Sequence, residues 1–247
     1  MGGALLDGWS KSGAFDPMDI GVLDPHPGEA AGRARTWGAA FDLDLGAAAT
    51  VILAVKPQLW REAACDIAPK LAPDAVVVSV AAGVRTHDLA EAFGGRRIAR
   101  VMPTTAVAVG QGTASIFAAR DEARARAHAL FDPIATTVDL DDEALMDAAT
   151  AVSGSGPADL YAFVEALEAA GVSAGLSPNQ AARLARSTVQ GAAALMAESG
   201  ADPAELRRQV TSPGGTTAAA LDVLLPALGP LLRDAVQAAV RRSRELG

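Results

Sequence analysis

The stretch Thr50-Val-Ile-Leu-Ala-Val-Lys-Pro57 decides the fold, because a continuous apolar run ends there at a charged residue and a proline. An unbroken run of Val, Ile, Leu and Ala is typical of a strand buried on both faces of a parallel sheet. A helix-like segment at 59–70 follows, and then a second apolar run at 75–80. Strand, helix and strand in this order predict a parallel pair joined by a crossover helix.

The same alternation extends across residues 1–140. Apolar runs predict the strands, and the more polar segments between them predict the helices. The predicted strands are 20–24, 50–55, 75–80, 98–101 and 113–118, and the predicted helices are 3–12, 59–70, 86–93 and 121–131. This pattern predicts an α/β fold in which residues 1–140 form a doubly wound, Rossmann-like domain that binds a dinucleotide.

After residue 140 the apolar residues recur with the period of a helix. The predicted helices are 141–151, 158–170, 178–198, 215–225 and 231–246. Several are rich in Ala, Leu and Val around their whole circumference, so they need a covering partner. We therefore predict an all-α domain over 141–247 that associates with a second subunit. The acidic residues near its start, Asp141, Asp142, Glu143 and Asp147, are interpreted as charges at a helix N-terminus.

Composition narrows the function classes. A formal net charge of −8 argues against a nucleic-acid surface, which needs clustered Lys and Arg. The sequence shows no uninterrupted apolar run that would cross a bilayer and no secretory signal pattern, so no membrane partner is predicted. A single cysteine, Cys65, suits a reducing cytoplasm. The three histidines lack metal-ligand spacing, and no metal site is predicted.

The stretch Thr211-Ser-Pro-Gly-Gly-Thr-Thr217 precedes an Ala- and Leu-rich segment that is predicted to be helical. Proline and glycine predict a loop here, and glycines allow an anion to approach the backbone closely. The N–H groups at the start of a helix lack partners within it and suit a carboxylate or a phosphate. Taken alone, such a stretch is more typical of an ordinary helix-entry turn.

Four further motifs accompany that loop: Val51-Ile-Leu-Ala-Val-Lys-Pro-Gln58, Ser79-Val-Ala-Ala-Gly-Val84, Arg100-Val-Met-Pro103 and Ser153-Gly-Ser-Gly-Pro157. In this order and spacing, the set resembles the pyrroline-5-carboxylate reductase family, the last enzyme of proline biosynthesis. The resemblance extends along the whole chain. It implies reduction of 1-pyrroline-5-carboxylate to L-proline with NADPH or NADH, by a homodimer or a larger homo-oligomer.

The resemblance assigns the 211–217 loop to the substrate. Its substrate-binding residues would be Ser212, Gly214, Gly215, Thr216 and Thr217. Thr217 would also be the catalytic residue, with its hydroxyl near the ring nitrogen to stabilise or relay the proton. No His, Lys or Cys stands out as a general acid, so the imine is expected to enter protonated. Catalysis would then rest mainly on orientation, which contributes about 7–11 kcal/mol in favourable cases.

The resemblance also marks the cofactor residues. They are Gly2, Asp24, Ala54, Val55, Lys56, Pro57, Ala81, Ala82, Gly83 and Thr104. Gly2 matches the third glycine of the dinucleotide fingerprint. Asp24 ends the second predicted strand, where an acid binds the adenosine ribose and repels a 2′-phosphate, so it favours NADH. The loop after residue 53 would follow the ribose and nicotinamide, and the small residues after Val80 would leave room for the ring.

Two positions depart from the family pattern. Met1-Gly-Gly-Ala4 matches the end of the glycine loop, so the first strand and two fingerprint glycines are missing. The missing strand would be central and its loss would expose apolar edges, so we expect the natural chain to extend upstream of Met1; a shortened, inactive copy is the alternative. Thr104 and Ala106 replace the usual Asn and Pro, which leaves one cofactor or loop hydrogen bond in question.

Two other functions stay open at this point. A related reductase acting on another small acid would share the first domain, but the intact 211–217 loop disfavours it. A non-catalytic, reductase-like dimeric protein that has lost cofactor binding is favoured by the missing glycines and opposed by the same loop. Titration with NAD(P)H separates this protein from an enzyme.

Overall fold

The computed structural model describes residues 1–41 and 43–246; Asp42 and Gly247, which the predicted domains include, lie outside this description. The chain forms two compact units, one made of residues 1–154 and 239–247 and the other of residues 155–238. The predicted domain boundary at residue 141 stays a prediction.

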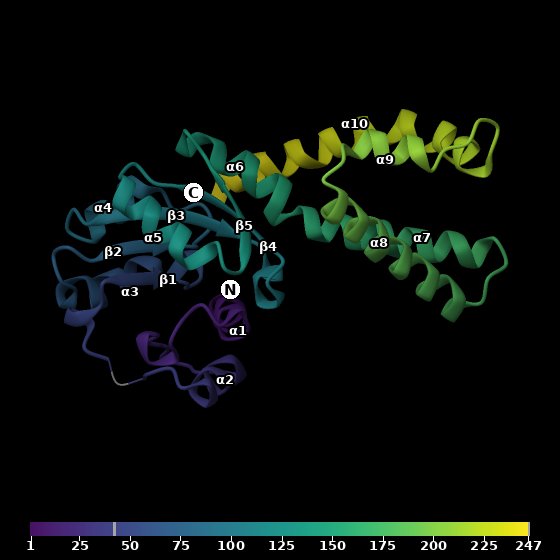
Figure 1. Ribbon diagram of the computed structural model, residues 1–247. Coiled ribbons are helices and arrows are strands. Elements are labelled where there is room, and N and C mark those ends of the chain that lie inside the picture. Colours follow the sequence, from purple (N-terminus) through teal and green to yellow (C-terminus); the bar gives the residue numbers. More distant parts are fainter. Residues whose placement is uncertain (42, 247) are drawn as a thin grey trace. The chain divides into compact units, whose positions relative to one another are not determined.

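A five-stranded sheet organises the first unit, with the strands in the order β1-β2-β3-β4-β5 (Figure 1). The strands are β1 (Thr50–Leu53), β2 (Val76–Ser79), β3 (Arg97–Pro103), β4 (Gly112–Phe117) and β5 (Ala135–Asp139). Neighbouring strands are parallel except β3 and β4, so the α/β prediction is confirmed but a purely parallel sheet is wrong. Only the short η5 (Thr105–Val109) joins β3 to β4, and a connection this short permits antiparallel pairing alone.

Both faces of the sheet are covered. The core on one face includes residues of α1 (Gly2–Ser12) and α5 (Asp121–Phe131), and the core on the other includes residues of α3 (Trp60–Ile67) and α4 (Thr86–Ala92). Strand β2 contributes to both: Val76 and Val78 to the first core, and Val77 to the second. Three consecutive valines, followed by the buried Ser79, are typical of a strand that is covered on both faces.

The predicted strand at 20–24 is wrong. The segment forms only an isolated parallel bridge, Gly21 with Ala40, in which the Val22 N–H donates to the Ala40 carbonyl over 2.8 Å. Pro25 and Pro27 follow directly, and proline has no N–H to extend a ladder.

The second unit contains helices. Here α7 (Gly156–Ser173) packs on α8 (Pro178–Ser199), and α9 (Pro203–Gln209) follows. A capping box in which Ser177 pairs with Gln180 begins α8. Before this unit, the predicted helix at 141–151 is divided into η6 (Glu143–Leu145), α6 (Met146–Ala149) and a π-helical turn η7 (Thr150–Gly154).

The last helix, α10 (Thr216–Leu246), corrects the predicted break between 225 and 231. It continues through Pro226 and Pro230, although each proline removes one N–H donor, because the surrounding residues are strong helix formers such as Leu and Ala. Because the helix is continuous, it also changes the expectation that no segment of the chain is long and apolar enough to cross a bilayer. An 18-residue window of the helix has a mean hydropathy of 1.3, and 6% of that window is buried within this chain, so length and composition alone would permit a membrane span.

Candidate functional site

Several of the predicted cofactor residues lie where β1 and β2 end and α1 begins. A Cβ added at Gly2 would lie 3.4 Å from the Cβ of Ala54, so the start of α1 contacts the chain just after β1. Ala81 follows the neighbouring strand β2, and the turn continues through Gly83, whose φ of 77° suits glycine. Ligands of open α/β sheets bind beyond the carboxyl ends of the strands, which is the edge these residues form.

The start of α1 offers backbone donors at this edge. The Ala4 and Leu5 N–H groups donate to the Met1 carbonyl over 2.8 and 3.2 Å, whereas those of Gly2 and Gly3 find no acceptor among the described residues. Glycine is needed for packing here as well, since a Cβ at Gly3 would lie 2.6 Å from that of Ala30 in α2 (Glu29–Trp37). Free N–H groups at a helix start suit a pyrophosphate, so the chain retains one structural requirement for a dinucleotide.

The other predicted cofactor residues differ in exposure. Lys56 is exposed and precedes the short η3 (Pro57–Leu59), while Val55 and Pro57 are half-buried. Asp24 is exposed, and its Oδ1 accepts the His26 N–H over 2.9 Å. The carboxylate is therefore held in a local turn that leaves its second oxygen available.

The structure shows one hydrogen bond that Thr104 makes in place of the usual Asn. Thr104 is buried, and its Oγ1 accepts the Thr113 N–H over 3.0 Å. The backbones of the same two residues are also joined, with Thr104 N–H donating to the Thr113 carbonyl over 2.9 Å. The hydroxyl oxygen thus closes the β3–β4 connection, and the hydroxyl hydrogen is what remains for a ligand.

In the second unit, the predicted substrate loop leads into α10. The Gly215 N–H donates to the Ser212 carbonyl over 3.0 Å, and Gly214 has a φ of 69°. The N–H groups of Thr216, Thr217 and Ala218 have no acceptor within the described chain. Ser212, Gly214 and Thr216 are exposed, and Gly215 and Thr217 are half-buried. The loop therefore presents consecutive unpaired donors, as the start of an α-helix does, and these donors suit an anion.

One cluster of charged residues was missed by the sequence interpretation. Glu143 lies in the first turn of η6, as the sequence indicated, but its carboxylate also binds two other elements: its Oε1 accepts the Thr86 N–H over 2.8 Å and pairs with Arg100 over 3.2 Å. The Arg100 side chain is only 5% exposed. The available signal was Arg100 between apolar residues of the predicted strand 98–101, because buried arginines are almost always paired.

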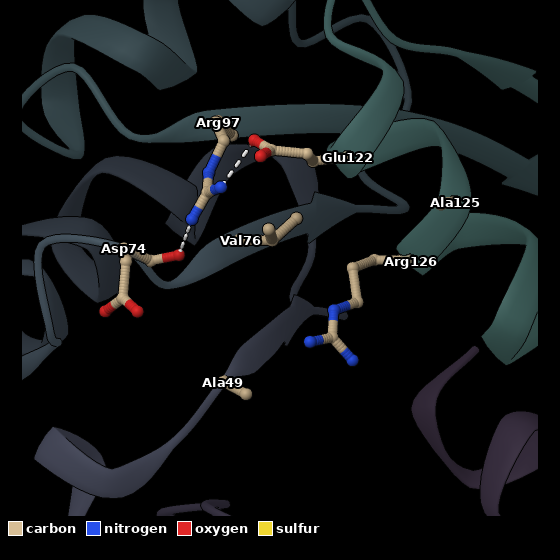
Figure 2. Close-up of a pocket in the computed structure, with 7 residues that line it drawn as sticks. All are labelled: Ala49, Asp74, Val76, Arg97, Glu122, Ala125 and Arg126. Carbon is tan, nitrogen blue, oxygen red and sulfur yellow. Dashed lines mark hydrogen bonds and ion pairs between the residues drawn. The ribbon is translucent and has the colours of Figure 1, made fainter.

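One cavity of the first unit lies elsewhere. It has a volume of about 410 Å³ and is lined by Ala49, Asp74, Val76, Arg97, Glu122, Ala125 and Arg126 (Figure 2). These residues lie at the amino ends of β1, β2 and β3 and on α5. The cavity is thus at the edge of the sheet opposite to the predicted cofactor residues, and its ionic groups include an Arg97–Glu122 pair that already satisfies both charges.

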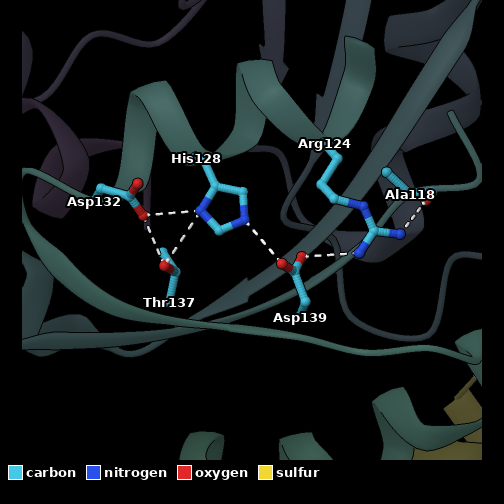
Figure 3. A network of polar contacts seen from close by, with 6 residues as sticks. All are labelled: Ala118, Arg124, His128, Asp132, Thr137 and Asp139. Carbon is cyan, nitrogen blue, oxygen red and sulfur yellow. Dashed lines mark hydrogen bonds and ion pairs between the residues drawn. The ribbon is translucent and has the colours of Figure 1, made fainter. Parts of the chain in front are cut away.

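A second polar cluster joins α5 to the edge strand β5 (Figure 3). His128 Nδ1 lies 3.0 Å from Asp132 and Nε2 lies 3.1 Å from Asp139, so both ring nitrogens face carboxylates. The Thr137 hydroxyl donates to Asp132 over 2.6 Å, and Arg124 pairs with Asp139 over 3.1 Å. The hydrogen bond to Asp132 raises the pKa of His128 and the bond to Asp139 adds to the rise, against the opposing effect of partial burial.

This geometry predicts a pH-dependent contribution to stability. Because the pKa of His128 in the folded protein lies above its ordinary value of 6.5, the stabilisation is complete below about pH 6.5 and is lost as the pH rises through the folded pKa. We expect His128→Gln to lower the free energy of unfolding by about 0.5–1 kcal/mol at pH 6 and by much less at pH 9, as measured by urea denaturation. The control is His87→Gln, at an exposed histidine of α4. Equal losses for His128→Gln at both pH values would contradict the prediction.

Comparisons with known proteins cover the whole chain. A family described as pyrroline-5-carboxylate reductase dimerisation matches residues 143–246, and one described as NADP oxidoreductase, coenzyme F420-dependent, matches residues 1–83. A pyrroline-5-carboxylate reductase of Pisum sativum is 39% identical over all of this chain and 92% of its own length. The structure of a pyrroline-5-carboxylate reductase from Coxiella burnetii is similar, with a TM-score of 0.91 and 30% identity over 99% of this chain and 94% of that one. A Plasmodium falciparum pyrroline carboxylate reductase with NADP bound has a TM-score of 0.84 and 26% identity, over 100% and 94% of the two chains.

Proposed function

Because the chain belongs to the pyrroline-5-carboxylate reductase family, we propose that it reduces 1-pyrroline-5-carboxylate to L-proline with NADPH or NADH. The observation that carries this function is the similarity to reductases of that name along the entire chain, rather than along one unit. This similarity disfavours the non-catalytic alternative, in which the cofactor site at the carboxyl ends of β1 and β2 would have been lost. The free donors of α1 and the Gly2–Ala54 contact remain at that edge.

The chemistry divides between the cofactor and the chain. When bound, the nicotinamide supplies a hydride to the carbon of the C=N bond, and the ring nitrogen, protonated, becomes the amine of proline. The chain's own task is to bind and orient. The unpaired N–H groups of Thr216 and Thr217, beside Gly215, are suited to the substrate carboxylate, and the Thr217 hydroxyl is placed by this proposal near the ring nitrogen. Orientation of this kind is a large part of catalysis when no strong acid is present.

We also propose that the chain acts as a homodimer or a larger homo-oligomer. In residues 155–238 only Ala181 and Ala185 are buried, while many large apolar side chains are exposed. The exposed set includes Leu160, Tyr161, Phe163, Leu167, Val172, Leu184, Leu195, Met196, Val223, Leu224, Leu225, Leu231 and Leu232. Apolar surface on this scale marks an interaction site, and a second copy of the same helices would cover it. This accounts for the hydropathy of α10 without a membrane, and the single cysteine supports a cytoplasmic location.

The test is oxidation of NADH and NADPH by the 247-residue chain with 1-pyrroline-5-carboxylate, followed by absorbance at the nicotinamide band. Substrate-dependent oxidation and formation of proline are expected. Binding of NAD(P)H without turnover would point to a different substrate, and an absence of binding would favour the non-catalytic alternative.

Asp24→Asn is expected to shift cofactor preference towards NADPH. The amide oxygen of Asn can still accept the His26 N–H, so the local turn is kept, but the negative charge that repels a 2′-phosphate is removed. We expect the ratio of kcat/KM for NADPH to that for NADH to rise about tenfold, which corresponds to roughly 1.4 kcal/mol. Steady-state kinetics with each cofactor measures the ratio. An unchanged ratio would show that Asp24 does not face the adenosine ribose.

A further inference from the structure

We propose that Arg100 and Glu143 are positioning residues for the cofactor edge, because together they fix the turn between β2 and α4 that contains Ala81, Ala82 and Gly83. The inference rests on the proposed function, since it concerns how the chain holds NAD(P)H. It assigns a role to the Arg100–Glu143 ion pair, which the sequence did not include among the cofactor-binding residues.

The turn is tied at both ends. At its start, the Ser79 Oγ accepts the Ala81 N–H over 3.3 Å inside the core. At its end, Thr86 begins α4, and the Glu143 carboxylate accepts both its N–H over 2.8 Å and its hydroxyl over 2.7 Å. The residue that would normally cap α4, Arg85, provides no side-chain cap. The start of the helix is therefore held by a carboxylate that is 57 residues away in the sequence.

Arg100 determines where that carboxylate lies. It belongs to β3, and its partner in the sheet register is Ser79 of β2. The guanidinium donates to Glu143 over 3.2 Å, and the two side chains are 5% and 21% exposed. One rigid strand thus carries the cation that orients Glu143, and Glu143 in turn orients Thr86.

Stability alone does not explain the Arg100–Glu143 ion pair. A buried ion pair loses much of its attraction to desolvation, and packed apolar side chains of similar size often stabilise a fold equally well. Arg100 Nε is moreover buried without a hydrogen-bond partner among the described residues. A buried donor without a partner is unfavourable, so its presence in a native structure needs an explanation. The need to hold the turn at 81–83 in place provides one.

The test uses Glu143→Gln, which keeps the size of the side chain but removes its charge and one acceptor oxygen. We expect hydrogen exchange of the amides at 81–86 to accelerate at least tenfold in the cofactor-free protein, and the Kd for NADPH, from its fluorescence, to rise at least tenfold. The matched control is Glu122→Gln, which breaks the more exposed ion pair of another β3 arginine, Arg97. It should change neither quantity.

Two outcomes would overturn the inference. In the first, the hydrogen-exchange rate of the amides at 81–86 rises no more in Glu143→Gln than in Glu122→Gln. In the second, the Kd of Glu143→Gln for NADPH equals that of the wild type. If Glu143→Gln does not fold, the double variant Arg100→Leu/Glu143→Gln removes both charges and should show the same weakened cofactor binding. If the wild-type protein binds NADPH and the variants bind it with the same Kd, only this inference is contradicted. A wild-type protein that binds no NAD(P)H contradicts the proposed function as well.

Discussion

Gly215→Val is expected to lower kcat/KM for 1-pyrroline-5-carboxylate at least 100-fold and to abolish saturation, while affinity for NADPH changes little. A Cβ at this position would lie 3.1 Å from the Ser212 carbonyl oxygen, and the branched side chain extends further. It would also stand beside the unpaired N–H groups of Thr216 and Thr217, where the proposed carboxylate binds. Hydrogen bonds to a charged group contribute about 1.5–3 kcal/mol each, so loss of two accounts for a factor of this size.

Initial rates over a range of substrate concentrations measure the effect, and NADPH fluorescence measures cofactor affinity. The matched control is Gly191→Ala in α8, where an added Cβ meets nothing within 4 Å. It should leave both quantities unchanged. A normal KM in Gly215→Val would remove the loop from substrate binding and return it to the role of a helix-entry turn.

The sequence predicted best those elements whose own composition defines them. The bounds of α5 agree with the prediction, because the helix begins at an acidic pair and carries buried Ala123, Ala127 and Phe131 at helical spacing. Strand β5 was missed because its residues Ala135–Asp139 are largely polar and lie at an edge of the sheet. Helix α2 was missed for a similar reason, since its exposed face is rich in charge.

In the candidate site, too, local motifs predicted some residues, whereas contacts between distant residues could not be predicted. The residues after β1 and β2 were predicted from motifs, and the structure places Gly2 beside Ala54; their roles in cofactor binding stay predictions. The contact between Arg100 and Glu143 joins residues 43 apart in the sequence, and no local pattern encodes it. Thr104 was identified as a departure from the family pattern, but its bond to Thr113 depends on how the two antiparallel strands meet.

Close packing of α1 is the second feature with a large expected consequence. Gly8 is buried against η5, and a Cβ added there would lie 2.3 Å from the Val107 carbonyl oxygen and 3.3 Å from Ile134 Cγ2. The nearest obstacle is backbone, which cannot rotate away as a flexible side chain can. Val107 is itself fully buried, so the strain cannot be relieved towards solvent. Since α1 provides free N–H donors at the proposed cofactor site, its packing on η5 bears on the proposed function as well as on stability.

Gly8→Ala is therefore expected to lower the free energy of unfolding by about 1–3 kcal/mol, the usual cost of overpacking, despite the gain in helix propensity. For a chain of this size, each kcal/mol corresponds to a fall in Tm of roughly 2–4 °C. Gly32→Ala in the adjacent helix α2 is the matched control, because its Cβ would meet nothing within 4 Å and alanine favours the helix. Thermal denaturation should separate the two variants, with Gly32→Ala equal to or above the wild type. Identical Tm values would mean that α1 can move away from Val107, and the Kd for NADPH of Gly8→Ala would then report whether the cofactor edge tolerates that movement.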